Sequence, residues 1–141
     1  MQIYNLFPLT IMQDKINLED KERNLLISEI EVMFNKEKKT KKGDFAWTGD
    51  TKGYEFLFSN NLFKDLANKI SRSIIKYLNA LEINTNKLEI YYQRSWATFT
   101  ENNQSINFHT HSQSNISFAY YLLKPANSGG IIFRSNELQN E

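Results

Sequence analysis

The chain contains two histidines, His109 and His111, which stand two residues apart. In a β-strand, residues i and i+2 point to the same face and lie about 6.6 Å apart along the backbone. Two imidazoles on one face can bind a single metal ion through nitrogen atoms at about 2.0–2.1 Å. Asn107 shares this face and is a candidate for a hydrogen bond within the site. The spacing alone is equally consistent with two structural histidines on a half-exposed strand, so both interpretations stay open at this point.

Other common catalytic motifs find no support in the sequence. The chain has no Cys, which excludes disulfides, thiolate metal sites and thiol nucleophiles. It contains neither a G-x-S-x-G nucleophile elbow nor a GxxxxGK[ST] phosphate-binding loop. The histidine pair is therefore the main candidate for chemistry.

Alternation of apolar and polar residues predicts the strands that would position the two histidines. The segments KLEIYYQRSWATFT (87–100) and INFHTH (106–111) are rich in aromatic or β-branched residues, and the polar ENNQS between them is typical of a turn. ISFAYYLL (116–123) predicts a third strand, and IIF (131–133) predicts a fourth after the Pro/Gly loop KPANSGG (124–130).

Apolar residues at spacings of three and four predict two helices upstream of these strands. One helix is expected over residues 18–35, with Asn17 as its N-cap, and a stronger one over residues 61–81. Residues 2–7 predict a short strand, and the lysine-rich stretch 36–42 is interpreted as a solvated loop. Helices followed by a run of short strands indicate an α+β architecture with a curled sheet or barrel at its centre.

The composition suits one folded domain over residues 1–141. Hydrophobic residues make up 40% of the chain and aromatic residues 13%, which is ample for a packed core. The net charge of +1 does not indicate nucleic acid or an anionic membrane as a partner. The N-terminus lacks the basic start and apolar run of a secretory signal, so we expect a cytoplasmic protein.

Residues 94–133 carry a series of motifs in a fixed order. They are Trp96, the pair His109 and His111, Ser117 with Tyr120-Tyr121-Leu122, the loop 125–130, and the apolar residues 131–133. This segment resembles the 2-oxoglutarate/Fe(II)-dependent oxygenases found in marine bacteria and their phages. The upstream residues WTGD and Gly53 (47–53) and the helix after them also resemble that family, so the resemblance covers most of residues 45–141.

The resemblance implies a fold and a chemistry. The fold would be a double-stranded β-helix of the jelly-roll or cupin-like kind, with the two N-terminal helices packed on its sheet. His109 and His111 would bind Fe(II), and oxidative decarboxylation of 2-oxoglutarate would drive hydroxylation of an unidentified substrate. Tyr121 would contact 2-oxoglutarate, while Trp96 and Ser117 would line the pocket.

Two departures from the family pattern bear on this interpretation. His111 stands where the wider superfamily has a carboxylate, and imidazole also suits Zn, Cu and Ni, so another divalent metal stays possible. The chain also has no histidine after His111 and no basic residue after Arg134 to match the distal ligand and the basic partner of the co-substrate. We therefore expect an incomplete barrel that is truncated at its C-terminus and associates with a second copy, and that could be inactive in this form.

Two other hypotheses remain beside the oxygenase. One is a cupin-like metalloprotein with another type of reaction. The other is a non-catalytic β-barrel module that serves binding or structure. Metal content would distinguish these two, and neither the sequence nor the resemblance identifies a substrate.

Overall fold

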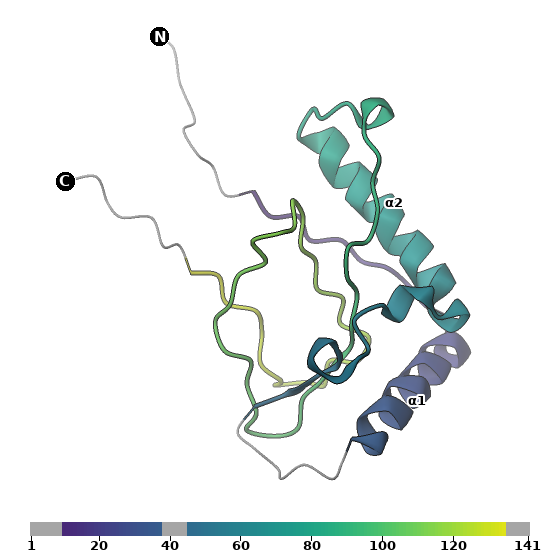
Figure 1. Ribbon diagram of the computed structural model, residues 1–141, viewed down its shortest axis with the longest axis vertical. Coiled ribbons are helices and arrows are strands. Elements are labelled where there is room, and N and C mark those ends of the chain that lie inside the picture. The colour runs from purple at the N-terminus through teal and green to yellow at the C-terminus, as the bar shows by residue number, and fades with distance from the viewer. Residues whose placement is uncertain (1–9, 38–44, 135–141) are drawn as a thin grey trace, which may run out of the picture.

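The computed structural model describes residues 10–37 and 45–134, and Figure 1 shows their arrangement. The predicted strand 2–7 and most of the lysine-rich stretch 36–42 lie outside these ranges. The elements, in chain order, are α1 (Asp20–Lys36), β1 (Trp47–Thr48), η1 (Gly49–Lys52), η2 (Leu57–Ser59), η3 (Asn61–Phe63), α2 (Lys64–Ala80), η4 (Thr85–Lys87) and β2 (Thr98–Phe99).

The first predicted helix is confirmed as α1, which begins two residues later than expected. Its N-cap is Glu19 rather than Asn17, and Asp20 lies in the first turn, where a carboxylate favours the helix dipole. The Arg23 guanidinium contacts the Asp20 carboxylate at 2.7 Å and donates to the carbonyl of Leu18 at 3.0 Å. These contacts attach the start of the helix to the segment before it.

The second predicted helix is confirmed as η3 followed by α2. The Asn60 side chain accepts a hydrogen bond from the backbone N–H of Leu62 at 3.0 Å, which satisfies one of the free donors at this helix start. The apolar stripe expected from the sequence supplies most of the buried side chains of this region: Phe63, Leu66, Ala67, Ile70 and Leu78.

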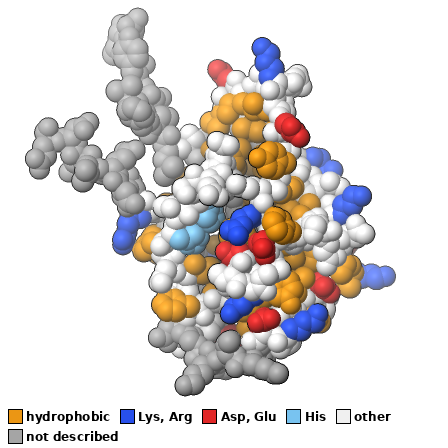
Figure 2. Space-filling view, in the orientation of Figure 1, with side chains coloured by type: hydrophobic (Ala, Val, Ile, Leu, Met, Phe, Trp, Pro, Cys, Tyr) orange, Lys and Arg blue, Asp and Glu red, His pale blue; other side chains and the backbone are white. Residues whose placement is uncertain are grey.

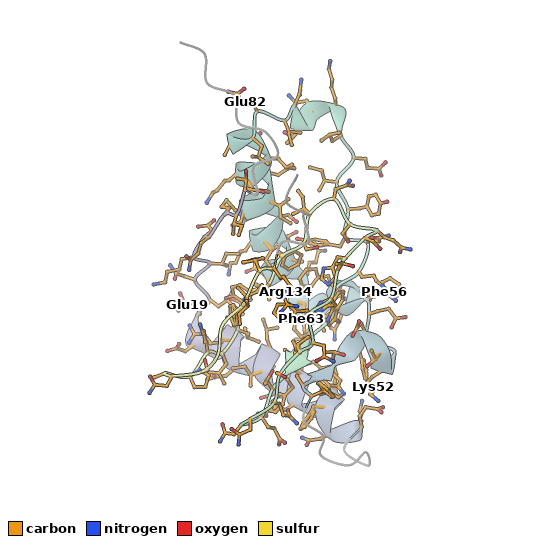
Figure 3. All side chains as sticks on the ribbon, turned by 90° about the vertical axis from the view of Figure 1, so that its left-hand side faces the viewer. Glu19, Lys52, Phe56, Phe63, Glu82 and Arg134 are labelled. Carbon is orange, nitrogen blue, oxygen red and sulfur yellow. The ribbon has the colours of Figure 1, made fainter. Side chains whose placement is uncertain are left out.

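The hydrophobic core lies between the two helices and the segments that contain η2 and β2. Leu26 of α1 and Phe63 are its most completely buried side chains, with 0% and 1% of their surface exposed. Figure 3 places Phe63 near the middle of the molecule. The cluster also contains Leu18, Met33, Leu57, Leu66, Ile70 and Ala97. An ion pair between Lys69 of α2 and Glu22 of α1, at 3.2 Å, joins the two helices at the margin of this core.

A short antiparallel sheet joins residues far apart in the sequence. Its two strands, β1 and β2, pair Trp47 with Phe99 and Thr48 with Thr98. The contact continues beyond the strands, because the N–H of Gly49 donates to the carbonyl of Ala97 at 2.9 Å. A Cβ at Gly49 would lie 3.3 Å from that carbonyl oxygen, so the close approach favours glycine here.

The expectation of a double-stranded β-helix is wrong for the structure described here. Over residues 10–37 and 45–134 the sheet has two strands only, in the order β1-β2, and no jelly-roll or cupin-like barrel is formed. Of the strands predicted over 87–100, 106–111, 116–123 and 131–133, only Thr98–Phe99 is a strand. The physical reason is that alternation predicts an extended chain with two faces, whereas a strand also requires a neighbouring chain to accept and donate its backbone hydrogen bonds.

The segment after the histidines keeps its predicted alternation without being a strand. Tyr120 and Leu122 pack against the core, while Tyr121 and Leu123 between and after them are exposed. The hydroxyl of Tyr120 donates to the carbonyl of Ile16 at 3.2 Å, which attaches this segment to the chain before α1. Figure 1 shows residues 100–134, in green to yellow, as extended chain beside the two helices. In the part of the chain that the structure describes, no helix is long and apolar enough to cross a membrane.

Candidate metal centre

The two histidines point their Nε2 atoms at each other. These atoms lie 3.1 Å apart, and the ring centroids are 5.0 Å apart with the ring planes at 46°. Both side chains are exposed, and Figure 2 shows histidine side chains, in pale blue, at the surface of the molecule. The predicted proximity of His109 and His111 is therefore present although residues 106–111 do not form a strand.

Each imidazole is oriented by a hydrogen bond at its other nitrogen. Nδ1 of His109 donates to the backbone carbonyl of Asn107 at 2.8 Å. Nδ1 of His111 lies 2.9 Å from the hydroxyl of Ser117. Metal-binding histidines in proteins are commonly held in this way, with the nitrogen that does not bind the metal hydrogen-bonded to a carbonyl, carboxylate or water.

The separation of the two Nε2 atoms fits a shared metal ion. Two nitrogens bonded to one ion at about 2.0–2.1 Å, with angles between the octahedral and tetrahedral values, are about 2.8–3.4 Å apart. The observed 3.1 Å falls within that interval. Within residues 10–37 and 45–134, no group of three or more His, Cys, Asp or Glu is arranged as a metal site. The candidate site in the described chain therefore consists of the two histidines and the groups that orient them.

Trp96 is the aromatic neighbour of the pair. Its indole stands edge-on to His111, with the ring centroids 5.6 Å apart and the planes at 78°. The residues on either side of it, Ser95 and Ala97, are buried. The Ser95 carbonyl accepts from the N–H of Leu57 at 2.7 Å, and its N–H donates to the carbonyl of Glu55 at 2.9 Å. These bonds fix the backbone at Trp96 against η2.

The turn after His111 brings Ser117 to the site. The N–H of Ser114 donates to the carbonyl of His111 at 3.0 Å, which reverses the chain. Phe118, the next residue after Ser117, stacks on Phe58 at 6.2 Å and meets the edge of Tyr92 at 5.9 Å. Ser117 is therefore held between a closed turn and an aromatic contact with the core.

The structure brings some of the predicted pocket residues to the histidines but not all of them. Trp96 and Ser117 contact His111, and Asn107 contributes its backbone carbonyl rather than its side chain. Tyr121 instead lies beneath the ammonium of Lys124, which is 5.1 Å from its ring centroid. The 2-oxoglutarate contact expected of Tyr121 stays a prediction.

Sequence reasoning missed the hydrogen bond between Ser117 and His111. The signal that could have indicated it is the polar turn SQSN (112–115), because a tight reversal there places a residue shortly after the turn beside one shortly before it.

Comparison of the chain with protein-family models, with characterised proteins and with solved structures finds no match.

Proposed function

We propose that His109 and His111 bind a divalent transition-metal ion through their Nε2 atoms. The observation that carries this proposal is the 3.1 Å separation of those atoms, with each Nδ1 already engaged in a hydrogen bond. Imidazole nitrogen suits Fe, Zn, Cu and Ni, so the ligand type defines a group of metals rather than one.

The sequence resemblance of residues 94–133 supports Fe(II) as the metal and 2-oxoglutarate as a co-substrate. Bound Fe(II), together with 2-oxoglutarate and O₂, would supply the oxidant for hydroxylating a substrate that is not identified. This part of the proposal rests on the motifs around the histidines, whereas the barrel fold that the same resemblance implied is not formed in the described residues.

Within this proposal the chain's own residues hold the two imidazoles in position. The Asn107 carbonyl and the Ser117 hydroxyl orient the two imidazoles. The Trp96 indole contacts the His111 imidazole in a T-shaped arrangement on one side. Tyr121 would meet the co-substrate, as the resemblance implies. A reducing cytoplasmic compartment belongs to the same proposal and suits a chain without Cys.

Metal analysis tests the proposal directly. The parent protein and the double variant His109→Ala/His111→Ala are loaded anaerobically with Fe(II), freed of excess ion and analysed for iron. We expect about one ion per chain in the parent and a loss of binding in the double variant. Ser112→Ala is the matched control, because Ser112 is an exposed neighbour of His111.

Addition of 2-oxoglutarate to the iron-loaded protein distinguishes the oxygenase function from metal binding alone. A weak visible charge-transfer band would support the oxygenase function. Stoichiometric iron binding without that band would support a metal-binding module and contradict the proposal that 2-oxoglutarate is a co-substrate. Equal iron in the parent and the double variant would contradict the metal site itself.

A further inference from the structure

The hydrogen bond of His109 determines which of its nitrogens carries the proton. The partner of its Nδ1 is the backbone carbonyl of Asn107, at 2.8 Å. A carbonyl oxygen can only accept, so Nδ1 of His109 is protonated. In a neutral imidazole the other nitrogen is then an acceptor, and Nε2 of His109 presents a lone pair.

The proton on His111 follows from that of His109. The two Nε2 atoms are 3.1 Å apart, which is hydrogen-bond distance, and one of them must donate. Since Nε2 of His109 is the acceptor, Nε2 of His111 carries the proton. When His111 is neutral as well, its Nδ1 is an acceptor, and the hydroxyl of Ser117 donates to it across the 2.9 Å contact. All three hydrogen bonds point in one direction, from Ser117 through His111 and His109 to the Asn107 carbonyl.

This order is incompatible with a metal ion bound by both histidines. An ion requires a lone pair on each Nε2, and His111 has a proton there instead. Nothing has to change at His109, whose proton is already on Nδ1. His111 must lose its proton from Nε2 to solvent and take one from solvent on Nδ1, with no net change in protons on the ring.

We propose that Ser117 is a positioning residue whose hydroxyl reverses its hydrogen bond with His111 when metal binds. It donates to Nδ1 in the metal-free protein and accepts from Nδ1–H in the metal-bound protein. A hydroxyl can do both, whereas a carbonyl or carboxylate could only accept. The metal-free protein thus keeps both imidazoles aligned by a direct hydrogen bond, and metal replaces the proton between them. The reversal rests on the proposed metal site, whereas the proton order of the metal-free protein does not.

Nitrogen-15 NMR of the two imidazoles tests the proposal, with Zn(II) as a diamagnetic probe. The proton order above applies to neutral imidazoles, so the spectra are recorded at mildly alkaline pH. We expect the metal-free parent to have His109 protonated at Nδ1 and His111 at Nε2. Saturation with Zn(II) should move the His111 proton to Nδ1 and leave that of His109 in place.

Substitutions at Ser117 test the role of the hydroxyl. Ser117 is exposed, so Ser117→Ala should leave the fold intact. It should weaken Zn(II) binding by about 10–100-fold, as is typical when a partner of a metal-bound histidine is lost. Ser117→Thr retains a hydroxyl and should restore most of the affinity. Ser114→Ala is the matched control, because the Ser114 hydroxyl contacts Gln93 rather than a histidine.

Two results would overturn the inference while the metal site survives. One is a metal-free His111 protonated at Nδ1, and the other is unchanged Zn(II) affinity in Ser117→Ala. Failure of the parent to bind Zn(II) would overturn the reversal together with the proposed metal site. The proton positions in the metal-free parent distinguish these cases, since they are measured without any ion.

Discussion

The indole of Trp96 stands edge-on to the imidazole of His111, with the ring centroids 5.6 Å apart and the planes at 78°. Trp96 is half-buried, and its backbone is fixed through the buried Ser95 and Ala97. The candidate site is exposed, but on one side it contacts Trp96, whose backbone is fixed by buried neighbouring residues.

Trp96 should report metal binding by fluorescence. A paramagnetic ion such as Co(II) on His111 would lie within the range at which it quenches the neighbouring indole, so emission should fall on titration. The chain has two tryptophans, and Trp96→Phe leaves only Trp47, which contacts Phe34 and Tyr54 instead of the histidines. This variant should lose most of the quenching while it still binds the ion. Equal quenching in both proteins would contradict the placement of Trp96.

Adjacent leucines of α1 should differ sharply in their effect on stability. Leu26 is 0% exposed and Leu25 is 52% exposed. Leu26→Ala removes methyl groups from the core and leaves a cavity, so the free energy of unfolding should fall by about 2–5 kcal/mol. Leu25→Ala, the control, should change it by about 0.5 kcal/mol or less. Urea unfolding followed by circular dichroism measures both, and similar losses would mean that α1 presents another face to the core.

The hydroxyl of Tyr92 should contribute to stability in a pH-dependent way. It donates to the carbonyl of Ala67 at 2.8 Å and contacts the Ser71 hydroxyl at 2.8 Å. Loss of these bonds in Tyr92→Phe should lower the free energy of unfolding by about 1 kcal/mol. Tyr91→Phe is the control, because Tyr91 is 75% exposed.

Alkaline pH should remove the advantage of the Tyr92 hydroxyl. Burial raises the pKa of Tyr92 above 10.0, and the hydrogen bond with Ser71 opposes this in part. A raised pKa means that the fold favours the protonated phenol, so its contribution is present below 10.0 and is lost as pH rises through the raised value. The stability difference between the parent and Tyr92→Phe should therefore shrink at high pH. A difference that grows there would contradict the assignment.

Asp14 should contribute to acid sensitivity. The hydrogen bond from the Ser73 hydroxyl, at 2.6 Å, is the main cause that lowers the pKa of Asp14, and the Lys15 N–H and Lys76 add to it. A lowered pKa stabilises the fold above 3.8, and this contribution is lost as pH falls below 3.8 through the lowered value. Asp14→Asn should therefore be less stable than the parent at neutral pH and approach it in acid. Ser73→Ala removes the main cause and should weaken the same pH dependence in unfolding experiments.

Exposed apolar side chains after the histidines lead us to expect association with a second copy. Leu123 is 65% exposed and Ile132 is 74% exposed, and exposed apolar side chains in extended segments favour association. The apparent mass measured by light scattering should rise with concentration, and Ile132→Lys should reduce that rise. Leu25→Lys is the control, because Leu25 is exposed on α1, away from these segments. A monodisperse monomer at high micromolar concentration would contradict the expectation.

Features whose geometry is set by residues close together in the sequence were predictable from the sequence. Both helices occur where spacings of three and four predicted them, because helical hydrogen bonds join residues four apart and the apolar stripe reflects the same period. The proximity of His109 and His111 was predictable for a similar reason. An extended chain places residues i and i+2 on one face whether or not it pairs with a neighbour.

Tertiary structure alone decided which extended segments pair and what surrounds the histidines. Ser95 bonds to Glu55 and Leu57, and Tyr120 to Ile16, across long stretches of chain. Alternation in 106–111 and 116–123 defines two faces but does not specify a partner, so the predicted barrel strands did not follow from it. Ser117 reaches His111 only because the turn closes and Phe118 packs on Phe58. Local periodicity thus determined the helices and the histidine pair, whereas contacts between distant residues, which no local pattern encodes, determined the sheet and the groups that orient the site.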